Sequence, residues 1–374
     1  MIRRLPVLTV LLVGLLVSAV AFQVPPLLRA ASVLTSTIGL EDETGLTAWV
    51  TEDIQSEEMT LPLAEPLQVI VHRPRHASSN HQGILLVHGI HPEGMRERRF
   101  QRFARSMAAV GNVVMTPSLP ELASLEATPH SVERIQAAAA ALAQRVQHPI
   151  LAIGISVGGG LTLMAAAAQQ GTSPIGQVAA IGAHHDLVRV ARHYAGVPAT
   201  DTEGHASDLK PHHYGIQVLA RAHAARLFDA EDVDTARMIL QSYLRQHYDA
   251  ARAALTQLTP PGQALMQALL SDPHGAVVKQ HLLAAITAVE SELRQVSPAG
   301  RLAGLRVPVL LLHGATDPVI PPTELSWLAH EVPTELLRAQ LVTPVLTHTE
   351  FPEDAKAADF VGILAFVAQL LPPL

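Results

Sequence analysis

Short apolar runs alternate with segments of helical spacing along two parts of this chain. The runs have the length of strands that are buried on both faces of a sheet. Between them, apolar residues recur at steps of three and four, as on helices that pack against a sheet. This alternation predicts an α/β fold with a mostly parallel sheet and helices on both of its faces. The predicted strands are 67–71, 83–89, 112–116, 150–153, 178–182, 307–314 and 340–346, and the predicted core helices are 99–110, 131–146, 323–330 and 357–371.

The strand pattern is interrupted in the second half of the chain. From about residue 184 to residue 300 no run resembles a strand, whereas helical spacing is strong. We therefore predict a core in two parts, residues 61–183 and 303–374, separated by a helical insertion at residues 184–302. The helical spacing of the insertion is clearest in 216–228, 233–248, 264–270 and 277–293.

The first 24 residues have the pattern of an export or anchor signal. Arg3 and Arg4 precede an almost unbroken apolar run at 5–24. Residues 19–21 (Ala-Val-Ala) fit a cleavage site, and the run is also long enough to span a bilayer if it is retained. We therefore expect an exported protein, periplasmic or extracellular, or one anchored to the membrane by this segment. Residues 25–60, with two prolines, acidic and threonine-rich segments and little periodicity, are expected to form a lead-in segment.

Composition and charge narrow the possible function classes. The net charge is −7, and no basic block offers a surface for nucleic acid. The chain contains no cysteine, which excludes disulfides, thiolate nucleophiles and cysteine-bound metals. The hydrophobic fraction of 48% is sufficient for a large core. We expect a globular protein that acts on a small molecule and binds no nucleic acid.

A serine lies in a glycine-rich turn between a predicted strand and a predicted helix. The turn at 154–159 (Gly-Ile-Ser-Val-Gly-Gly) precedes an apolar segment at 161–168. Such a turn lifts the hydroxyl of Ser156 above the sheet edge and directs the N-terminus of the next helix toward it. The glycines leave room where the backbone doubles back. Ser156 is therefore a candidate nucleophile, although similar turns occur in phosphate-binding folds.

Two later loops carry the partners that such a serine needs. A serine hydroxyl becomes a nucleophile when a base takes its proton and an acid orients that base. Asp317 follows the predicted strand 307–314, and His348 follows the predicted strand 340–346. Both should lie at the carboxyl ends of parallel strands, which is the sheet edge that Ser156 also occupies. The order Ser, Asp, His along the chain strengthens the nucleophile interpretation.

The chain resembles the α/β-hydrolases over residues 65–183 and 303–374. The resemblance rests on His88-Gly89 after an early strand, the serine turn, the Gly-x-x-Asp-x-x-Ile-Pro segment that ends at Pro321, and His348. It implies the α/β-hydrolase fold, with the insertion as a helical cap between core strands 6 and 7. Substrate choice would be made in this cap.

The same resemblance implies a serine hydrolase that cleaves a carboxylic ester, or a related acyl bond, through an acyl-enzyme intermediate. Ser156 would be the nucleophile, His348 the general acid and base, and Asp317 the orienting acid. The backbone N–H groups of Val157 and Ile90 would form the oxyanion hole. The glycine run that many lipases and esterases carry after the early strand is shorter here. No cofactor is implied.

Other assignments stay open from the sequence. Asp186 rivals Asp317 as the orienting acid, or it caps a helix at the start of the insertion. His88 is expected to brace the loop before the oxyanion hole. An alternative function is that of a non-catalytic ligand-binding or surface interaction protein whose cap has closed the site.

The many histidines and a run of arginines could also have a function. The chain has 20 histidines, yet it lacks the His-Glu-x-x-His spacing of zinc hydrolases, so we expect no metal. The basic run at 96–105 is expected to form the exposed face of the first core helix, where it could also dock an acidic substrate or a lipid head group.

Overall fold

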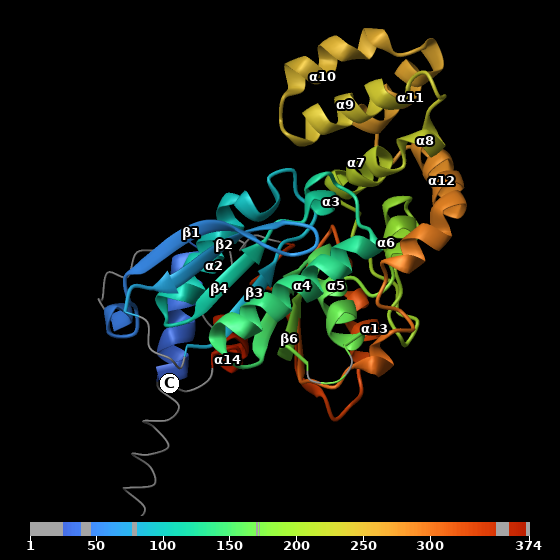
Figure 1. Ribbon diagram of the computed structural model, residues 1–374. Coiled ribbons are helices and arrows are strands. Elements are labelled where there is room, and N and C mark those ends of the chain that lie inside the picture. The colour runs from blue at the N-terminus through green and yellow to red at the C-terminus, as the bar shows by residue number, and fades with distance from the viewer. Residues whose placement is uncertain are drawn as a thin grey trace, which may run out of the picture.

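An eight-stranded sheet forms the centre of the protein in the computed structural model, which describes residues 25–38, 46–76, 81–169, 171, 173–348 and 359–371 (Figure 1). The strand order is β1-β2-β4-β3-β5-β6-β7-β8. β1 and β2 pair antiparallel to each other, β2 also pairs antiparallel to β4, and the other neighbours are parallel. The mostly parallel sheet is confirmed. The strands are β1 (Ile54–Leu61), β2 (Leu67–Pro74), β3 (Gly83–Val87), β4 (Val113–Pro117), β5 (Ile150–Ile155), β6 (Ile175–Ile181), β7 (Val309–Gly314) and β8 (Leu337–Thr343).

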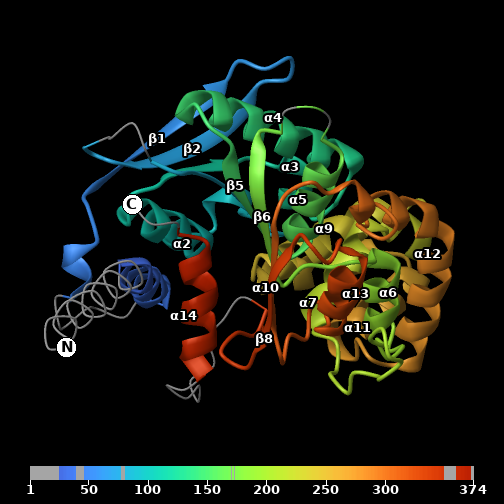
Figure 2. The same cartoon turned by 90° about the horizontal axis from the view of Figure 1, so that it is seen from below.

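Helices cover both faces of this sheet because successive strand residues point to opposite faces. In β3, Ile84 and Leu86 pack with the helix at 25–38, α2 and α14. Figure 2 shows these three helices together on one side of the sheet. Leu85 and Val87 pack on the opposite side with α4 and α5. The core helices are 25–38, α2 (Arg98–Ala109), α3 (Pro120–Ala123), α4 (Pro129–Val146), α5 (Val157–Ala167), α13 (Thr323–Glu331) and α14 (Phe360–Gln369), with 3-10 turns at Leu46–Trp49 and Gly94–Arg96. Two further 3-10 turns lie within the helical insertion, at Leu255–Gln257, and at its end, at Leu302–Gly304.

The predicted helical insertion is present between β6 and β7, and we call residues 184–302 the cap. Its buried side chains, such as Ile239 and Val289, belong to the same apolar cluster as those of α4 and α5. Figure 1 shows α9, α10 and α11 at the end of the cap farthest from the sheet. The cap helices are α6 (Leu187–Tyr194), α7 (His213–Ala222), α8 (Ala224–Leu227), α9 (Val233–Leu244), α10 (Tyr248–Ala254), α11 (Pro260–Ser271) and α12 (Ala276–Gln295).

The segment 25–60 is more structured than its sequence pattern indicates. The helix at 25–38 buries Ala30, Val33 and Leu34, one stripe at helical spacing. The strand β1 is a sheet edge with mostly exposed side chains, so no alternation of apolar and polar residues marks it. Core structure therefore begins before residue 61, contrary to the expectation of a lead-in segment.

Two other boundaries differ from prediction. The single helix expected at 233–248 is divided into α9 and α10, because Gln246 between them has a φ of 63° and cannot continue a right-handed helix. The last strand, β8, begins and ends three residues earlier than the predicted strand 340–346. Its register with β7 ends at the pair Gly314 and Thr343, and Val345 and Leu346 are buried in the loop that follows.

The predicted signal or anchor at 1–24 lies outside the described residues. In the part of the chain that the structure describes, no helix combines the length and the apolar character that crossing a membrane requires.

Candidate active site

Ser156 occupies the turn between β5 and α5 in an unusual backbone conformation. Its φ is 56° and its ψ is −131°, a region that a residue with a side chain rarely adopts. Its backbone N–H donates to the carbonyl oxygen of Ile181 at the end of β6, at 2.8 Å. The turn is thereby tied to the neighbouring strand, which offsets the strain and holds the serine at the sheet edge.

Gly154 and Gly158 make this turn possible for the reason that the sequence suggested. A Cβ on Gly158 would lie 2.2 Å from the carbonyl oxygen of His88, and one on Gly154 would lie 2.5 Å from the carbonyl oxygen of Gly158. Both distances are shorter than a side-chain carbon tolerates. The strand, the turn and the helix can pack this closely only because these positions carry no side chain.

The loop after β3 lies directly against the serine turn. A Cβ on Gly89 would be 2.9 Å from Cβ of Ser156 and 3.4 Å from its Oγ. Among the described residues, the backbone N–H groups of Ile90 and Val157 have no hydrogen-bond acceptor. Two unpaired donors are therefore carried by the two loops that meet at Ser156, which is the arrangement an oxyanion hole needs.

His88 braces this loop. Leu119 donates its backbone N–H to Nε2 of His88 at 3.3 Å, so the ring's own N–H is at Nδ1, 2.8 Å from the carbonyl oxygen of Gly89. Burial lowers the pKa of His88 to about 4. The ring is neutral at pH 7, and its contacts are structural, as expected from the sequence.

Asp317 and His348 are hydrogen-bonded to each other, although separate loops carry them. Nδ1 of His348 lies 2.7 Å from Oδ2 of Asp317, whose side chain is fully buried. Oδ1 of Asp317 accepts the backbone N–H groups of Val319 and Ile320 at 2.8 and 2.9 Å. The loop after β7 thus fixes the carboxylate, and the carboxylate orients the imidazole.

A second histidine, which the sequence reasoning missed, contacts the same carboxylate. Nε2 of His313 in β7 lies 3.4 Å from Oδ2 of Asp317 and 2.9 Å from the carbonyl oxygen of Ile320. Burial alone would raise the pKa of Asp317, but the charge of His348 and hydrogen bonds from both histidines outweigh it and lower this pKa. Asp317 is therefore an anion. The available signal was the position of His313, four residues before Asp317 and at the end of the same strand.

Gly182 shows that the serine and the Asp317–His348 pair lie at one edge of the sheet. It directly follows Ile181, the acceptor of the Ser156 N–H. A Cβ on Gly182 would lie 3.5 Å from Oδ2 of Asp317 and 3.8 Å from Nδ1 of His348. The two adjacent residues Ile181 and Gly182 at the end of β6 thus lie next to all three predicted residues. No hydrogen bond joins Ser156 directly to His348, both of which are described residues.

Asp186, the rival acid, has a different partner. Its side chain accepts the backbone N–H of Val188 at 2.8 Å and caps α6. The structure pairs His348 with Asp317 and uses Asp186 at a helix terminus.

The cap contacts the site through α7, an approach that no sequence pattern predicts. The hydroxyl of Tyr214 donates to the carbonyl oxygen of Ile90 at 3.1 Å, and the backbone N–H of His212 donates to the carbonyl oxygen of Pro318 at 2.7 Å. Burial raises the pKa of Tyr214, so its hydroxyl keeps its proton. The start of α7 therefore touches both the loop after β3 and the loop of Asp317.

The many histidines do not gather around a common point in the described part of the chain. There, no group of three or more histidine, aspartate or glutamate side chains is arranged so that it could hold a metal ion.

Comparison with known proteins identifies the family. The sequence profile of the alpha/beta hydrolase fold matches residues 126–342, more than half of the chain. The protein therefore belongs to the α/β-hydrolase fold family, as the sequence motifs suggested. A search of curated proteins found no match.

Solved structures of the same fold include esterases and a peptidase. An acylaminoacyl peptidase of Pyrococcus horikoshii is 14% identical over 88% of this chain, with a TM-score of 0.45, and the chain spans only 42% of that protein. An esterase of Pyrobaculum calidifontis is 18% identical, with 84% of this chain and 85% of that chain covered and a TM-score of 0.44. The esterase domain of a Rhodothermus marinus protein is 16% identical, with coverages of 86% and 96% and a TM-score of 0.41. These likenesses carry no argument about substrate.

Proposed function

We propose that this protein is a serine hydrolase that cleaves a carboxylic ester, or a related acyl bond, through an acyl-enzyme intermediate. The observation that carries the proposal is the 2.7 Å hydrogen bond between Asp317 and His348 at the sheet edge where Ser156 sits in its strained turn. Serine activation requires an oriented histidine at the sheet edge that carries the serine.

The reaction follows from these groups. Because Nδ1 of His348 donates to the Asp317 carboxylate, Nε2 carries the lone pair that accepts the Ser156 proton. The Ser156 oxygen bonds to the acyl carbon, and the negative charge that develops on the carbonyl oxygen is stabilised by the N–H groups of Ile90 and Val157. The protonated His348 then gives its proton to the leaving alcohol. Water, activated by the same histidine, hydrolyses the ester on Ser156 and restores the serine.

The test compares two serine variants of the same chain. We expect wild-type protein to be labelled by a fluorophosphonate and to turn over p-nitrophenyl esters, and Ser156→Ala to do neither. The control is Ser271→Ala at the end of α11, where an exposed hydroxyl only bonds to the carbonyl oxygen of Gln267. This variant should react like wild type.

Two outcomes would contradict the proposal. Equal labelling of wild type and Ser156→Ala would show that another group reacts. Absence of both labelling and turnover in wild type, with a ligand still bound by Ser156→Ala, would favour the alternative of a non-catalytic ligand-binding protein. A panel of esters with graded acyl length would then measure the depth of the acyl site in the active case.

We also propose that the hydrolase domain acts outside the cytoplasm, free or tethered by residues 5–24. Support comes from the sequence, where two arginines precede the apolar run. N-terminal sequencing of the mature protein distinguishes cleavage after residue 21 from retention of the segment.

A further inference from the structure

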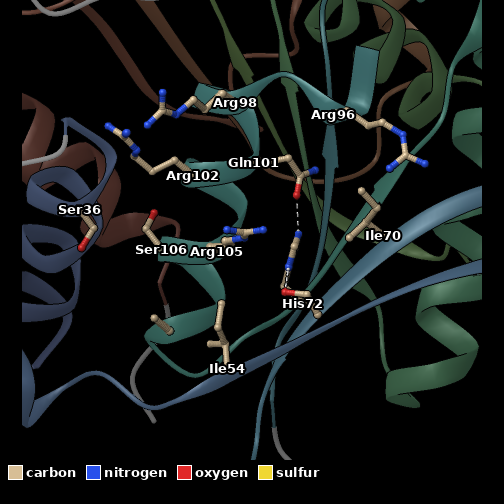
Figure 3. Close-up of a pocket in the computed structure, with 12 residues that line it drawn as sticks. Ser36, Ile54, Ile70, His72, Arg96, Arg98, Gln101, Arg102, Arg105 and Ser106 are labelled. Carbon is tan, nitrogen blue, oxygen red and sulfur yellow. Dashed lines mark hydrogen bonds between the residues drawn. The ribbon is translucent and has the colours of Figure 1, made fainter. Parts of the chain in front are cut away.

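A pocket of about 700 Å³ lies far along the sheet from the candidate active site. It is formed by the helix at 25–38, β1, β2 and α2, at the β1 edge of the sheet (Figure 3). Ser156, Asp317 and His348 instead follow β5, β7 and β8. The mechanism proposed above uses none of its residues. Its lining is Ser36, Ile54, Ser56, Ile70, His72, Arg96, Arg98, Gln101, Arg102, Arg105, Ser106 and Ala109.

Arginines dominate one wall of this pocket. Arg98, Arg102 and Arg105 are spaced by four and three residues, so α2 presents them on one face. Figure 3 shows the side chains of Arg98, Arg102 and Arg105 extending from α2. Within the described residues, none of the three has an ion-pair or hydrogen-bond partner, whereas Arg96 pairs with Glu58. Like charges at this spacing repel each other, and no acidic side chain is among the described residues of the lining.

The floor of the pocket is a fixed polar network. His72 is fully buried between Oγ of Ser56, 2.7 Å from its Nδ1, and Oε1 of Gln101, 2.8 Å from its Nε2. Gln101 in turn donates to the carbonyl oxygen of Met95 at 2.6 Å. Because these groups satisfy one another, the floor holds the first turns of α2 in place and leaves the arginines as the unsatisfied groups.

We propose that this pocket binds a phosphate group. Three guanidinium groups that lack a counter-charge among the described residues suit a ligand that carries up to two negative charges and several acceptor oxygens, since guanidinium matches phosphate with paired N–H donors. The volume admits a phosphate together with part of the molecule that bears it. The source is either a soluble phosphate or the head group of an anionic phospholipid. The second source is within reach because the helix that borders the pocket directly follows the apolar run at 5–24.

The experiment measures binding of inorganic phosphate to the full chain in neutral detergent, by calorimetry at constant ionic strength. A second arm measures the binding of micelles that contain phosphatidylglycerol, with phosphatidylcholine micelles as the neutral reference. The test variant is Arg98→Gln, Arg102→Gln, Arg105→Gln. The control variant, Arg226→Gln, Arg252→Gln, Arg306→Gln, removes the same charge from exposed positions elsewhere.

We expect wild type and the control to bind a phosphate probe saturably, and the test variant to bind at least tenfold more weakly. Binding of inorganic phosphate identifies a soluble source, and binding of phosphatidylglycerol alone identifies a lipid source. The proposal is overturned if wild type binds neither probe, or if test and control variants weaken binding equally. The single variant Arg102→Gln, with an intermediate loss expected, serves if the triple variant does not fold.

Discussion

At the scale of single residues, the two candidate acids have different surroundings. Asp317 receives two backbone N–H groups on Oδ1 and faces two histidines with Oδ2. Asp186 receives one backbone N–H and caps a helix. An anion that orients a histidine must be buried, fixed and adjacent to it, and of these two only Asp317 has those properties.

Asp317→Asn should therefore lower kcat for a p-nitrophenyl ester by about 10⁴-fold, because an amide cannot stabilise the imidazolium and favours the wrong tautomer. The matched change Asp186→Asn should leave kcat nearly unchanged, since asparagine also caps helices well. Steady-state kinetics on both variants checks this. If Asp186→Asn lost as much activity as Asp317→Asn, the assignment of the acid would be wrong.

Some residues of the candidate site could be predicted from the sequence, and others were not. Ser156, Asp317 and His348 could be predicted because each follows a recognisable strand, and the ends of parallel strands share an edge. His313 and Tyr214 were missed. His313 lies in an apolar run that predicts only a strand, and Tyr214 reaches Ile90 from a cap helix whose position over the core depends on tertiary packing.

At the scale of elements, the joint between cap and core is a buried ion pair. Glu324 in α13 is fully buried and accepts the backbone N–H groups of His185 and Asp186 as well as two N–H groups of Arg189 in α6. The guanidinium of Arg189 also lies 4.6 Å from the centre of the Trp327 ring. One carboxylate thus joins the first cap helix to the core at the point where the chain leaves the sheet.

Glu324→Gln should destabilise the protein by on the order of 3 kcal/mol, because Arg189 then lacks its counter-charge and the amide N–H₂ faces other donors. The control is Glu290→Gln, which removes the solvent-accessible partner of Arg294 in α12 and of Arg192 in α6. It should change stability little, since solvent screens such pairs. Urea unfolding followed by circular dichroism measures both. Similar midpoints for the two variants would show that the joint does not hold the cap.

The elements themselves were predicted best where both faces are buried. β3, β5 and β7 are buried along most of their length and appear in the sequence as apolar runs. The edge strand β1 could not be predicted, because most of its side chains face solvent and its pairing with β2 is made by backbone groups. The helix at 25–38 was not predicted for a related reason: serines and threonines interrupt its apolar stripe.

At the scale of the whole molecule, stability should depend on two buried neutral histidines. Burial lowers the pKa values of His88 and His184 to about 4 each. His88 supports the loop after β3, while Nε2 of His184 bonds to the carbonyl oxygen of Val296 at the end of the cap, 2.9 Å away. Both rings must lose their hydration to become buried, and a proton would make that loss far more costly.

Lowering the pH should destabilise the folded protein through these two rings. Unfolded histidine takes up a proton below about pH 6.5, whereas these two folded rings do so only near pH 4. The unfolded state therefore binds more protons between these values, and the free energy of unfolding falls as the pH decreases from about 6.5 to about 4. Each ring contributes a slope of up to about 1.4 kcal/mol per pH unit.

His184→Gln should remove the contribution of one ring, so the free energy of unfolding should depend less steeply on pH. The amide can still donate to Val296 but does not titrate. Urea unfolding at several pH values between 4 and 7, for wild type and this variant, gives the two slopes. Parallel curves would show that His184 does not contribute.

The crowding around Gly154 and Gly158 determines how tolerance to substitution in this region should be interpreted. A Cβ at either glycine would collide with backbone atoms whether or not the protein has any enzymatic activity. Intolerance at these two positions would therefore report on folding alone. Ser156 is different, because an alanine there retains the Cβ that the turn already accommodates and removes only the hydroxyl. Intolerance to substitution at Ser156 can thus be distinguished from intolerance at the two flanking glycines, and only intolerance to alanine at Ser156 would indicate a chemical role.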